Sequence, residues 1–232
     1  MSMKIGIVVA TKEEMSPFFE VFGPNDQSFS AVNGSYEVFK WNLEKHNSAI
    51  YLVQSGFGEI AATSSVQYLI SEHGVNMVIN YGVVGGLDDG CSVGKIGYVE
   101  RAVHYDFDIS ANGHYAQGEY PGKGVFLRPE KDAVPQPTLK YYGLSEFVCA
   151  SADKFVAAGE PKRKLKRDFG ADICEMEAAG IIITCNRNSV PVTLIKAVSD
   201  GVNEDSEAFK KNVQDASLKC VKLIHKILYN AT

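Results

Sequence analysis

Three acidic residues, Glu14, Glu177 and Asp200, have the type and the position in the sequence to carry acid–base chemistry. A carboxylate can take a proton from water or balance a positive charge, and a protonated carboxyl can donate to a leaving group. Glu14 and Asp200, like Gly56 and Gly82, follow apolar runs that are typical of buried strands. Because ligands bind at the carboxyl ends of strands in open α/β sheets, we expect these four positions to meet at one cleft.

Each acidic residue also has a purely structural interpretation. Thr11 and Glu14 have the spacing of a capping box, in which Glu14 bonds the first amide of a helix. Glu175 and Glu177 lie at the start of a predicted helix, where acidic residues commonly interact with the helix dipole. Asp200 can equally cap a turn or a helix. The residue types alone leave both interpretations open at each position.

Other motifs exclude particular kinds of site rather than identify one. The glycine-rich segment 82–86 is predicted to be a tight turn, and it lacks the spacing of a dinucleotide-binding or P-loop phosphate site. Phe155 is either a core aromatic or a platform on which a ligand ring stacks. His104 and His114 have no further His or Cys at metal-ligand spacing, so no zinc site is expected. No G-x-S-x-G elbow of a serine hydrolase is present.

The composition narrows the class of protein. The net charge of -5 and the isoelectric point near 5.6 argue against a nucleic-acid partner, since nucleic-acid binders usually carry a basic stripe. No apolar run reaches the length of a signal-peptide core or a membrane span, so no membrane partner is expected. The five cysteines form no CxxC pair and are typical of reduced thiols in the cytoplasm. At this length we expect one domain over residues 1–232.

Strands alternate with helices along the chain, with a hairpin around 44–47 near the start. Such an order predicts an α/β fold in which a mixed sheet lies between helical layers, a three-layer α/β/α sandwich. The segment 106–137 is rich in Gly, Pro, Asn and Tyr and is predicted to be an irregular, functional connection. The predicted strands are 4–10, 36–43, 49–54, 76–81, 95–104, 146–150, 173–174 and 191–198, and the predicted helices are one that ends near Val21, 59–73, 161–169, 176–186 and 206–229.

Taken in order, several segments resemble the nucleoside phosphorylase/nucleosidase superfamily, and most of all the bacterial 5′-methylthioadenosine/S-adenosylhomocysteine nucleosidases. The segments extend from Lys4 to Gly201, and the combination of Glu-Met-Glu with a later Ser-Asp is specific. The resemblance implies the fold of that family, with a mixed and partly barrel-like central sheet. The matching segments are KIGIVVATKEEM, SGFGEIAAT, INYGVVGGL, VGKIGYVERAVHYDFD, SADKFV, CEMEAAGI and KAVSDG.

This resemblance implies a role for each acidic residue. Glu14 becomes the base for the attacking water, and Glu177 holds the ribose hydroxyls with Met176 packed under the sugar. Asp200, with Ser199 beside it, protonates or hydrogen-bonds N7 of the purine. An ionised Glu14 and a proton-donating Asp200 fit this chemistry, because departure of the base leaves charge on the purine and an oxocarbenium-like sugar.

Further positions of the substrate site follow from the same resemblance. Phe155 becomes the platform that stacks on the purine, and the backbone of Val156 bonds the adenine edge. Gly82 and Phe209 are likewise assigned to the substrate site.

Five positions depart from the family pattern. Lys196 stands where an arginine usually braces the ribose-binding glutamate, and it keeps the charge without the bidentate geometry. Val83 and Val84 remove a hydroxyl from the glycine-rich segment. Thr11 and Phe57 replace an apolar residue and a smaller aliphatic one, so we expect an altered pocket around the 5′ substituent. That pocket would accept 5′-hydroxyl nucleosides more readily, unless Thr11 turns inward to cap the helix.

The reaction and the partners also follow from the resemblance. Phosphorylases of this fold need arginines to hold phosphate, whereas Lys12 and Lys196 are the only cations that the matched segments supply near the expected site. We therefore expect a small-molecule purine nucleoside, methylthioadenosine or S-adenosylhomocysteine, to be hydrolysed with water as nucleophile and without cofactor or metal. The alternatives are a phosphate-dependent purine nucleoside phosphorylase, a nucleosidase for adenosine or futalosine, and a non-catalytic binder. A homodimer is implied, in which the partner's copy of 106–122 closes the 5′ pocket.

Overall fold

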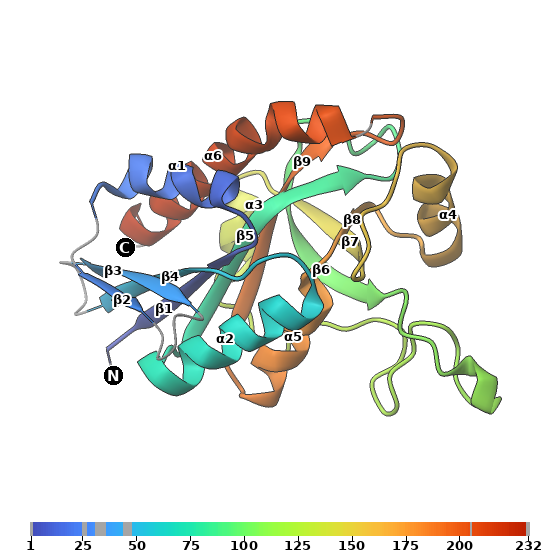
Figure 1. Ribbon diagram of the computed structural model, residues 1–232, viewed down its shortest axis with the longest axis horizontal. Coiled ribbons are helices and arrows are strands. Elements are labelled where there is room, and N and C mark those ends of the chain that lie inside the picture. The colour runs from blue at the N-terminus through green and yellow to red at the C-terminus, as the bar shows by residue number, and fades with distance from the viewer. Residues whose placement is uncertain (1, 25–26, 31–35, 44–47, 205, 231–232) are drawn as a thin grey trace.

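The computed structural model describes residues 2–230 except 25–26, 31–35, 44–47 and 205, so the predicted hairpin turn at 44–47 lies outside the described residues. Within these residues the strands are β1 Lys4–Val9, β2 Gln27–Ser30, β3 Glu37–Leu43, β4 Ser48–Gln54, β5 Met77–Gly86, β6 Ile96–His104, β7 Ser145–Ser151, β8 Ile173–Glu175 and β9 Val192–Asp200. They form one mixed sheet in the order β2-β3-β4-β1-β5-β8-β7-β6-β9 (Figure 1). β5 pairs with β9 as well, which closes part of the sheet into a ring. The predicted mixed, partly barrel-like sheet is confirmed.

Helices cover both faces of this sheet. α1 and α6 pack against each other over one face, and α2 and α5 pack together over the other (Figure 1). The three-layer arrangement predicted from the element order is therefore confirmed. The helices are α1 Lys12–Phe22, α2 Glu59–His73, α3 Gln136–Tyr141, α4 Glu160–Phe169, α5 Ala178–Arg187 and α6 Ser206–Asn230, with a short 3-10 helix at Ser110–Asn112.

The apolar sequence of β1 follows from its place between the two helical layers. Ile5, Ile7 and Val9 belong to the core cluster that also includes residues of α1 and α6. Val8 belongs to the cluster on the other face, with residues of α2 and α5. Successive side chains of a strand point to opposite faces, so a strand covered on both faces must be apolar throughout. The polar residues that follow β1 are consequently held at the rim of a fully packed sheet.

The predicted tight turn at 82–86 is wrong, because β5 continues through it to Gly86. None of the three glycines has a positive φ. They instead leave room for close neighbours. A Cβ on Gly86 would lie 2.0 Å from the carbonyl oxygen of Cys91, and one on Gly82 would lie 2.7 Å from Oε1 of Glu14. A glycine in a strand often marks such a close approach.

Three smaller differences concern weak sequence signals. β2 and α3 were not predicted, since four and six residues are too few for a periodic pattern. α5 begins at Ala178 rather than at Met176, because the segment 175–177 serves the cavity described below.

Segment 106–137 contains little regular structure, as predicted. None of the helices in the described part of the chain is both long and apolar enough to cross a bilayer.

Candidate active site

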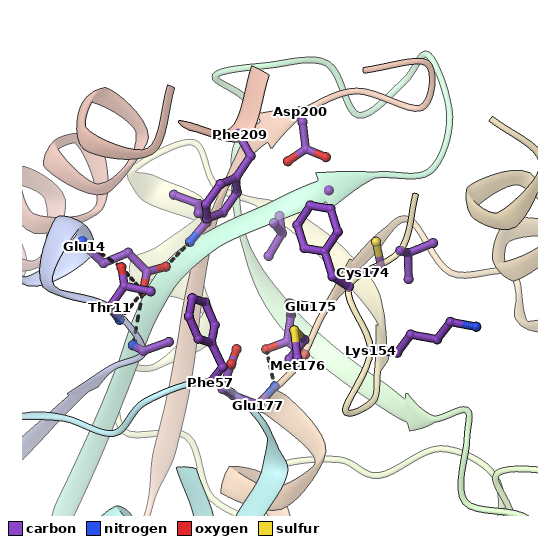
Figure 2. Close-up of a pocket in the computed structure, with 16 residues that line it drawn as sticks. Thr11, Glu14, Phe57, Lys154, Cys174, Glu175, Met176, Glu177, Asp200 and Phe209 are labelled. Carbon is purple, nitrogen blue, oxygen red and sulfur yellow. Dashed lines mark hydrogen bonds between the residues drawn. The ribbon is translucent and has the colours of Figure 1, made fainter. Parts of the chain in front are cut away.

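A cavity lies at the carboxyl ends of β1, β5, β8 and β9, where the sequence predicted a cleft (Figure 2). Three of the predicted site residues, Gly82, Lys196 and Ser199, do not line it but lie next to its carboxylates. Gly56 does not line it either. The predicted residues that do line it are Glu14, Phe57, Phe155, Val156, Met176, Glu177, Asp200 and Phe209.

Glu14 is both a helix cap and a cavity residue, so its two interpretations hold together. Oε2 accepts hydrogen bonds from the backbone amides of Thr11 (3.0 Å) and Ala10 (3.1 Å), which completes a capping box at the start of α1. Oε1 accepts from the amide of Val83 at 2.9 Å. Burial raises the pKa of Glu14, although these amides and the charge of Lys196 offset part of the effect. The result is a fixed carboxylate of increased basicity.

Thr11 lines the cavity, but its hydroxyl group is engaged in the cap. Oγ1 accepts from the amide of Glu14 at 3.2 Å and lies 3.3 Å from Oε2 of the same residue. Of the two outcomes expected for Thr11, the structure has the inward-turned cap. Of the two residues expected to alter the 5′ pocket, only Phe57 therefore remains a candidate.

The segment 175–177 divides its two glutamates between structure and cavity. Glu175 caps α5, because its carboxylate accepts from the amides of Glu177 (3.1 Å) and Ala178 (3.0 Å). The side chain of Glu177 makes no such cap and instead accepts from the amide of Gly58 at 3.1 Å. Burial and the neighbouring Glu175 raise the pKa of Glu177 to about 8. The helix-dipole interpretation thus belongs to Glu175, whereas Glu177 lines the cavity without capping the helix.

Lys196 pairs with a different glutamate from the one that the resemblance implied. Its Nζ lies 3.0 Å from Oε2 of Glu175, and both side chains are almost fully buried. Burial raises the pKa of Glu175, but Lys196 and the hydrogen bonds outweigh it, so the pKa falls below its usual value. The expected direct brace on Glu177 is replaced by an indirect one, through Glu175.

Asp200 ends β9 and has a donor on each carboxylate oxygen. The hydroxyl of Ser199 donates to Oδ1 at 2.7 Å, and Nζ of Lys162 donates to Oδ2 at 2.5 Å. The sequence predicts a helix over residues 161–169 but does not single out Lys162 among its basic residues. Its position three residues before Leu165, which is also buried, was the available signal, since such a pair shares one helix face. We call Glu14, Glu177 and Asp200 the floor of the cavity.

A further buried acid, Glu59 at the start of α2, was also missed. It accepts from the hydroxyl of Ser151 and the amide of Gly180, both at 2.5 Å. Burial, followed by the charge of Glu175, raises its pKa well above the usual value. Glu59 does not line the cavity, and its two hydrogen bonds join the start of α2 to β7 and α5.

Aromatic side chains form the mouth of the cavity, which we define as Phe57, Phe155 and Phe209. Phe155 is 52% exposed and Phe57 is 64% exposed. The rings of Phe155 and Phe209 meet edge to face, with centroids 6.0 Å apart. A large aromatic that stays exposed beside a cavity is not a core residue, so the core interpretation of Phe155 is wrong. These rings offer apolar surface to a planar ligand.

Cations are scarce around the cavity. Among the described residues that line it, Lys154 is the only one with a positive charge, and its side chain points away from the floor (Figure 2). Lys12 is exposed and does not line the cavity. No group of three His, Cys, Asp or Glu side chains in the described parts of the chain is arranged to hold a metal ion.

Comparison with known proteins identifies the family. Residues 4–229 match the phosphorylase superfamily. The chain is 31% identical over 228 residues to the 5′-methylthioadenosine/S-adenosylhomocysteine nucleosidase of Actinobacillus succinogenes, with 96% of each chain covered. It is 28% identical over 212 residues to the aminodeoxyfutalosine nucleosidase of Campylobacter jejuni, which covers 88% of this chain and 89% of that protein.

A solved structure agrees with these relatives. The crystal structure of the 5′-methylthioadenosine/S-adenosylhomocysteine nucleosidase from Helicobacter pylori, with butyl-thio-DADMe-Immucillin-A, superposes with a TM-score of 0.90. The two chains are 26% identical, and 99% of each is covered. The family resemblance read from the sequence is thereby confirmed: this chain belongs to the phosphorylase superfamily.

Proposed function

We propose that this protein hydrolyses the N-glycosidic bond of 5′-substituted adenine nucleosides, with methylthioadenosine and S-adenosylhomocysteine as substrates. The chain is an N-glycosyl hydrolase by family, since its relatives are named nucleosidases. The observation that carries the proposal is the floor of the cavity, where Glu14, Glu177 and Asp200 come together from three separate elements. Their buried carboxyl groups can serve the water, the sugar and the base of one nucleoside.

Glu14 is suited to activate the nucleophilic water. Backbone amides from two elements hold both of its oxygens, so the side chain cannot rotate away when it takes up a proton. A general base works best when its pKa approaches the working pH, and burial shifts the pKa of Glu14 in that direction. The water proton therefore passes to Glu14 as the water oxygen bonds to C1′.

Glu177 is suited to the sugar. In its ionised form it can accept hydrogen bonds from the ribose hydroxyls and stabilise the positive charge that develops on the ring. Met176, also in the lining, provides apolar contact beside it. Because the pKa of free Glu177 is about 8, the developing positive charge of the transition state favours the ionised form more than the neutral substrate does.

Asp200 is suited to the leaving base, with Phe155 as the stacking platform and Val156 beside it in the lining. A proton delivered to N7 neutralises the departing purine, and such acid catalysis contributes about 10²–10⁴-fold. Ser199 fixes the carboxyl orientation through its hydrogen bond to Oδ1.

Water is favoured over phosphate as nucleophile because the described lining contains no arginine. Phosphate recognition commonly relies on a rigid guanidinium fork or on a lysine aimed at the anion, and Lys154 points elsewhere (Figure 2). Aminodeoxyfutalosine is the second candidate substrate, supported by the similarity to the Campylobacter jejuni nucleosidase and by the open, aromatic mouth.

The test is a substrate panel with and without phosphate. Methylthioadenosine, S-adenosylhomocysteine, adenosine and aminodeoxyfutalosine are incubated with the protein, and free base, free sugar and sugar 1-phosphate are separated by chromatography. We expect free base and free sugar at the same rate in both buffers. Formation of ribose 1-phosphate with strict phosphate dependence would instead assign a phosphorylase, and binding without turnover would assign a binder.

We further propose a cytoplasmic homodimer. All five cysteines are buried free thiols, which fits a reducing compartment. Ile60 on α2 is 80% exposed beside a second hollow that also includes residues of α5, and the segment 106–122 extends away from the sheet (Figure 1). A second copy would cover this face and bring its own 106–122 to the mouth. Light scattering should give a mass about twice 25.3 kDa, and a monomer at all concentrations would contradict the proposal.

A further inference from the structure

Lys162 is a charged residue buried against the floor of the cavity. Its side chain is 1% exposed, and Nζ lies 2.5 Å from Oδ2 of Asp200. The same ammonium donates to the carbonyl oxygen of Gly201 at 2.8 Å and lies 3.5 Å from that of Glu204. Burying an ammonium group is strongly unfavourable unless its partners compensate. All three of its partners lie at the end of β9 or directly after it, so this lysine serves that segment alone.

The approach of Lys162 to Asp200 depends on Gly85 of β5. A Cβ on Gly85 would lie 3.0 Å from Sγ of Cys174, 3.1 Å from Nζ of Lys162 and 3.2 Å from Oδ2 of Asp200. The register of β5 with β9 shifts between Val84 and Gly85. The ammonium and the carboxylate therefore meet over a glycine at an irregular point of the strand, and a side chain there would force them to move.

The attachment of α4 to the sheet does not explain why Lys162 is buried. Lys166 of the same helix already reaches Asp172 at 2.7 Å and Asp88 at 2.8 Å. Arg163 donates to the side chain of Asn203. These contacts lie nearer the surface and hold the helix without burying a charge. A buried ion pair is also a weak source of stability compared with apolar packing of similar volume.

We propose that Lys162 is a positioning residue for Asp200, which holds its carboxyl group and stabilises the carboxylate that remains after the proton has moved to purine N7. This inference rests on the proposed function. In the step, Asp200 gives up a proton that it takes up from solvent when the nucleoside binds: the C1′–N9 bond breaks with its electron pair passing to the base, the O–H bond of Asp200 breaks and the N7–H bond forms. The new carboxylate is then compensated by the donors already in place, Lys162 and Ser199. Lys162 keeps its own protons.

The choice of leaving group separates this role from a structural one. A purine leaves with help from a proton at N7, whereas 4-nitrophenolate leaves as a stable anion and needs no proton. Loss of Lys162 should therefore slow the hydrolysis of methylthioadenosine but not that of 4-nitrophenyl β-ribofuranoside. A variant that merely distorts the cavity would slow both reactions.

The experiment measures kcat and KM on both substrates for the wild type, K162M, K162R and D200N, with K166M as the matched control on the same helix. For K162M we expect kcat on methylthioadenosine to fall by about 100-fold, at the lower end of general-acid effects, with KM changed by less than about threefold. Its kcat on the nitrophenyl riboside should stay within about threefold of the wild type. D200N should show the same selectivity, K162R should recover part of the loss, and K166M should match the wild type.

Equal losses of K162M on both substrates, or no loss on methylthioadenosine, would overturn the inference. Should K162M not fold, as judged by circular dichroism, K162R and G85A decide the matter. G85A keeps the lysine but crowds both its ammonium and the carboxylate of Asp200, so a loss selective for methylthioadenosine is expected, and equal losses would again overturn the inference. A folded wild type that cleaves the nitrophenyl riboside but no purine nucleoside would overturn the proposed function and this inference together.

Discussion

Glu14, Glu177 and Asp200 at the floor of the cavity are each less than a tenth exposed, whereas Phe57 and Phe155 at its mouth leave more than half of their surface open. Every floor carboxylate accepts a hydrogen bond from a protein donor, and those donors belong to strands or helix starts. The mouth has apolar contacts only. The floor is thus formed by residues of one chain, and under the proposed function its chemistry does not involve the 5′ substituent. We propose that substrate preference depends on the mouth, the part of the cavity that is still open.

The largest effect should come from the floor. We expect Glu14→Gln to lower kcat by about 10²–10⁴-fold on every nucleoside that the protein accepts, with little change in KM. Glutamine keeps an oxygen for the helix cap but cannot take the water proton. The measurement is steady-state release of base, and Glu13→Gln, an exposed neighbour on the same helix, is the matched control. Near-full activity of Glu14→Gln would leave Glu14 with the capping role alone.

A substitution beside the floor, at a buried residue that does not line the cavity, should act on stability. Lys196→Met removes the ammonium that compensates buried Glu175, and we expect the free energy of unfolding to fall by about 3–5 kcal/mol. Urea unfolding followed by fluorescence provides the measurement. Lys154→Met, which removes the exposed cation of the same cavity, should change stability by less than about 0.5 kcal/mol. A similarly small change for Lys196→Met would mean that the floor does not depend on buried compensation.

At the mouth, effects should be graded and should differ between substrates. Phe57→Val shortens an exposed ring and enlarges the opening, so kcat/KM for S-adenosylhomocysteine should rise relative to methylthioadenosine. A change of this kind is worth about 1–3 kcal/mol in discrimination. Tyr141→Leu, at an exposed aromatic residue of α3 outside the cavity lining, is the control. Equal effects of Phe57→Val on both substrates would contradict the proposal that the mouth determines substrate preference.

The last effect concerns pH and is spread over several pH units. The pKa of Glu177 is raised from 4.5 in the unfolded chain to about 8 in the folded one, so the folded state binds the extra proton between these values. Glu177 therefore stabilises the free protein fully below pH 4.5, and this contribution is lost as the pH rises towards 8. We expect unfolding free energies that decline by at most about 1.4 kcal/mol per pH unit from this group. The decline should be shallower in Glu177→Gln, and parallel curves for the two proteins would contradict the assigned ionisation.

Long periodic segments of the sequence predicted the fold well. The pattern of α2 gave its limits at Glu59 and His73, and the apolar runs gave the buried strands. The segment 82–86 was wrongly predicted to be a turn, because glycine occurs both in turns and where two parts of the chain approach closely. Only the tertiary structure shows which of the two applies. The three carboxylates of the floor were found through their family resemblance. Their positions next to strand ends would by themselves have left the structural interpretations equally open.

The supporting residues were harder to predict than the carboxylates. Lys162 is one of several basic residues in a short helix, and the sequence does not show which of them faces inward until the neighbouring strands are placed. Lys196 was identified, but its partner was assigned to Glu177 instead of Glu175, because two glutamates two residues apart cannot be told apart by spacing. Which donor meets which acceptor is decided by tertiary packing, which leaves no local pattern in a single chain.

The glycines of β5 have a consequence for how this strand can vary. Gly82 adjoins Oε1 of Glu14, Gly85 adjoins the meeting point of Lys162 and Asp200, and Gly86 adjoins a backbone carbonyl of Cys91. Replacing each glycine with alanine should therefore impair the protein in a way that depends on the neighbour. At Gly86 the neighbour is main chain and cannot yield, so cells should contain less protein. At Gly82 and Gly85 the neighbours are side chains, so the protein should accumulate normally and lack turnover. A mutational scan that measures abundance and activity separately should therefore divide this strand in two. Substitution of Gly86 should lower abundance, whereas substitution of Gly82 or Gly85 should lower activity alone.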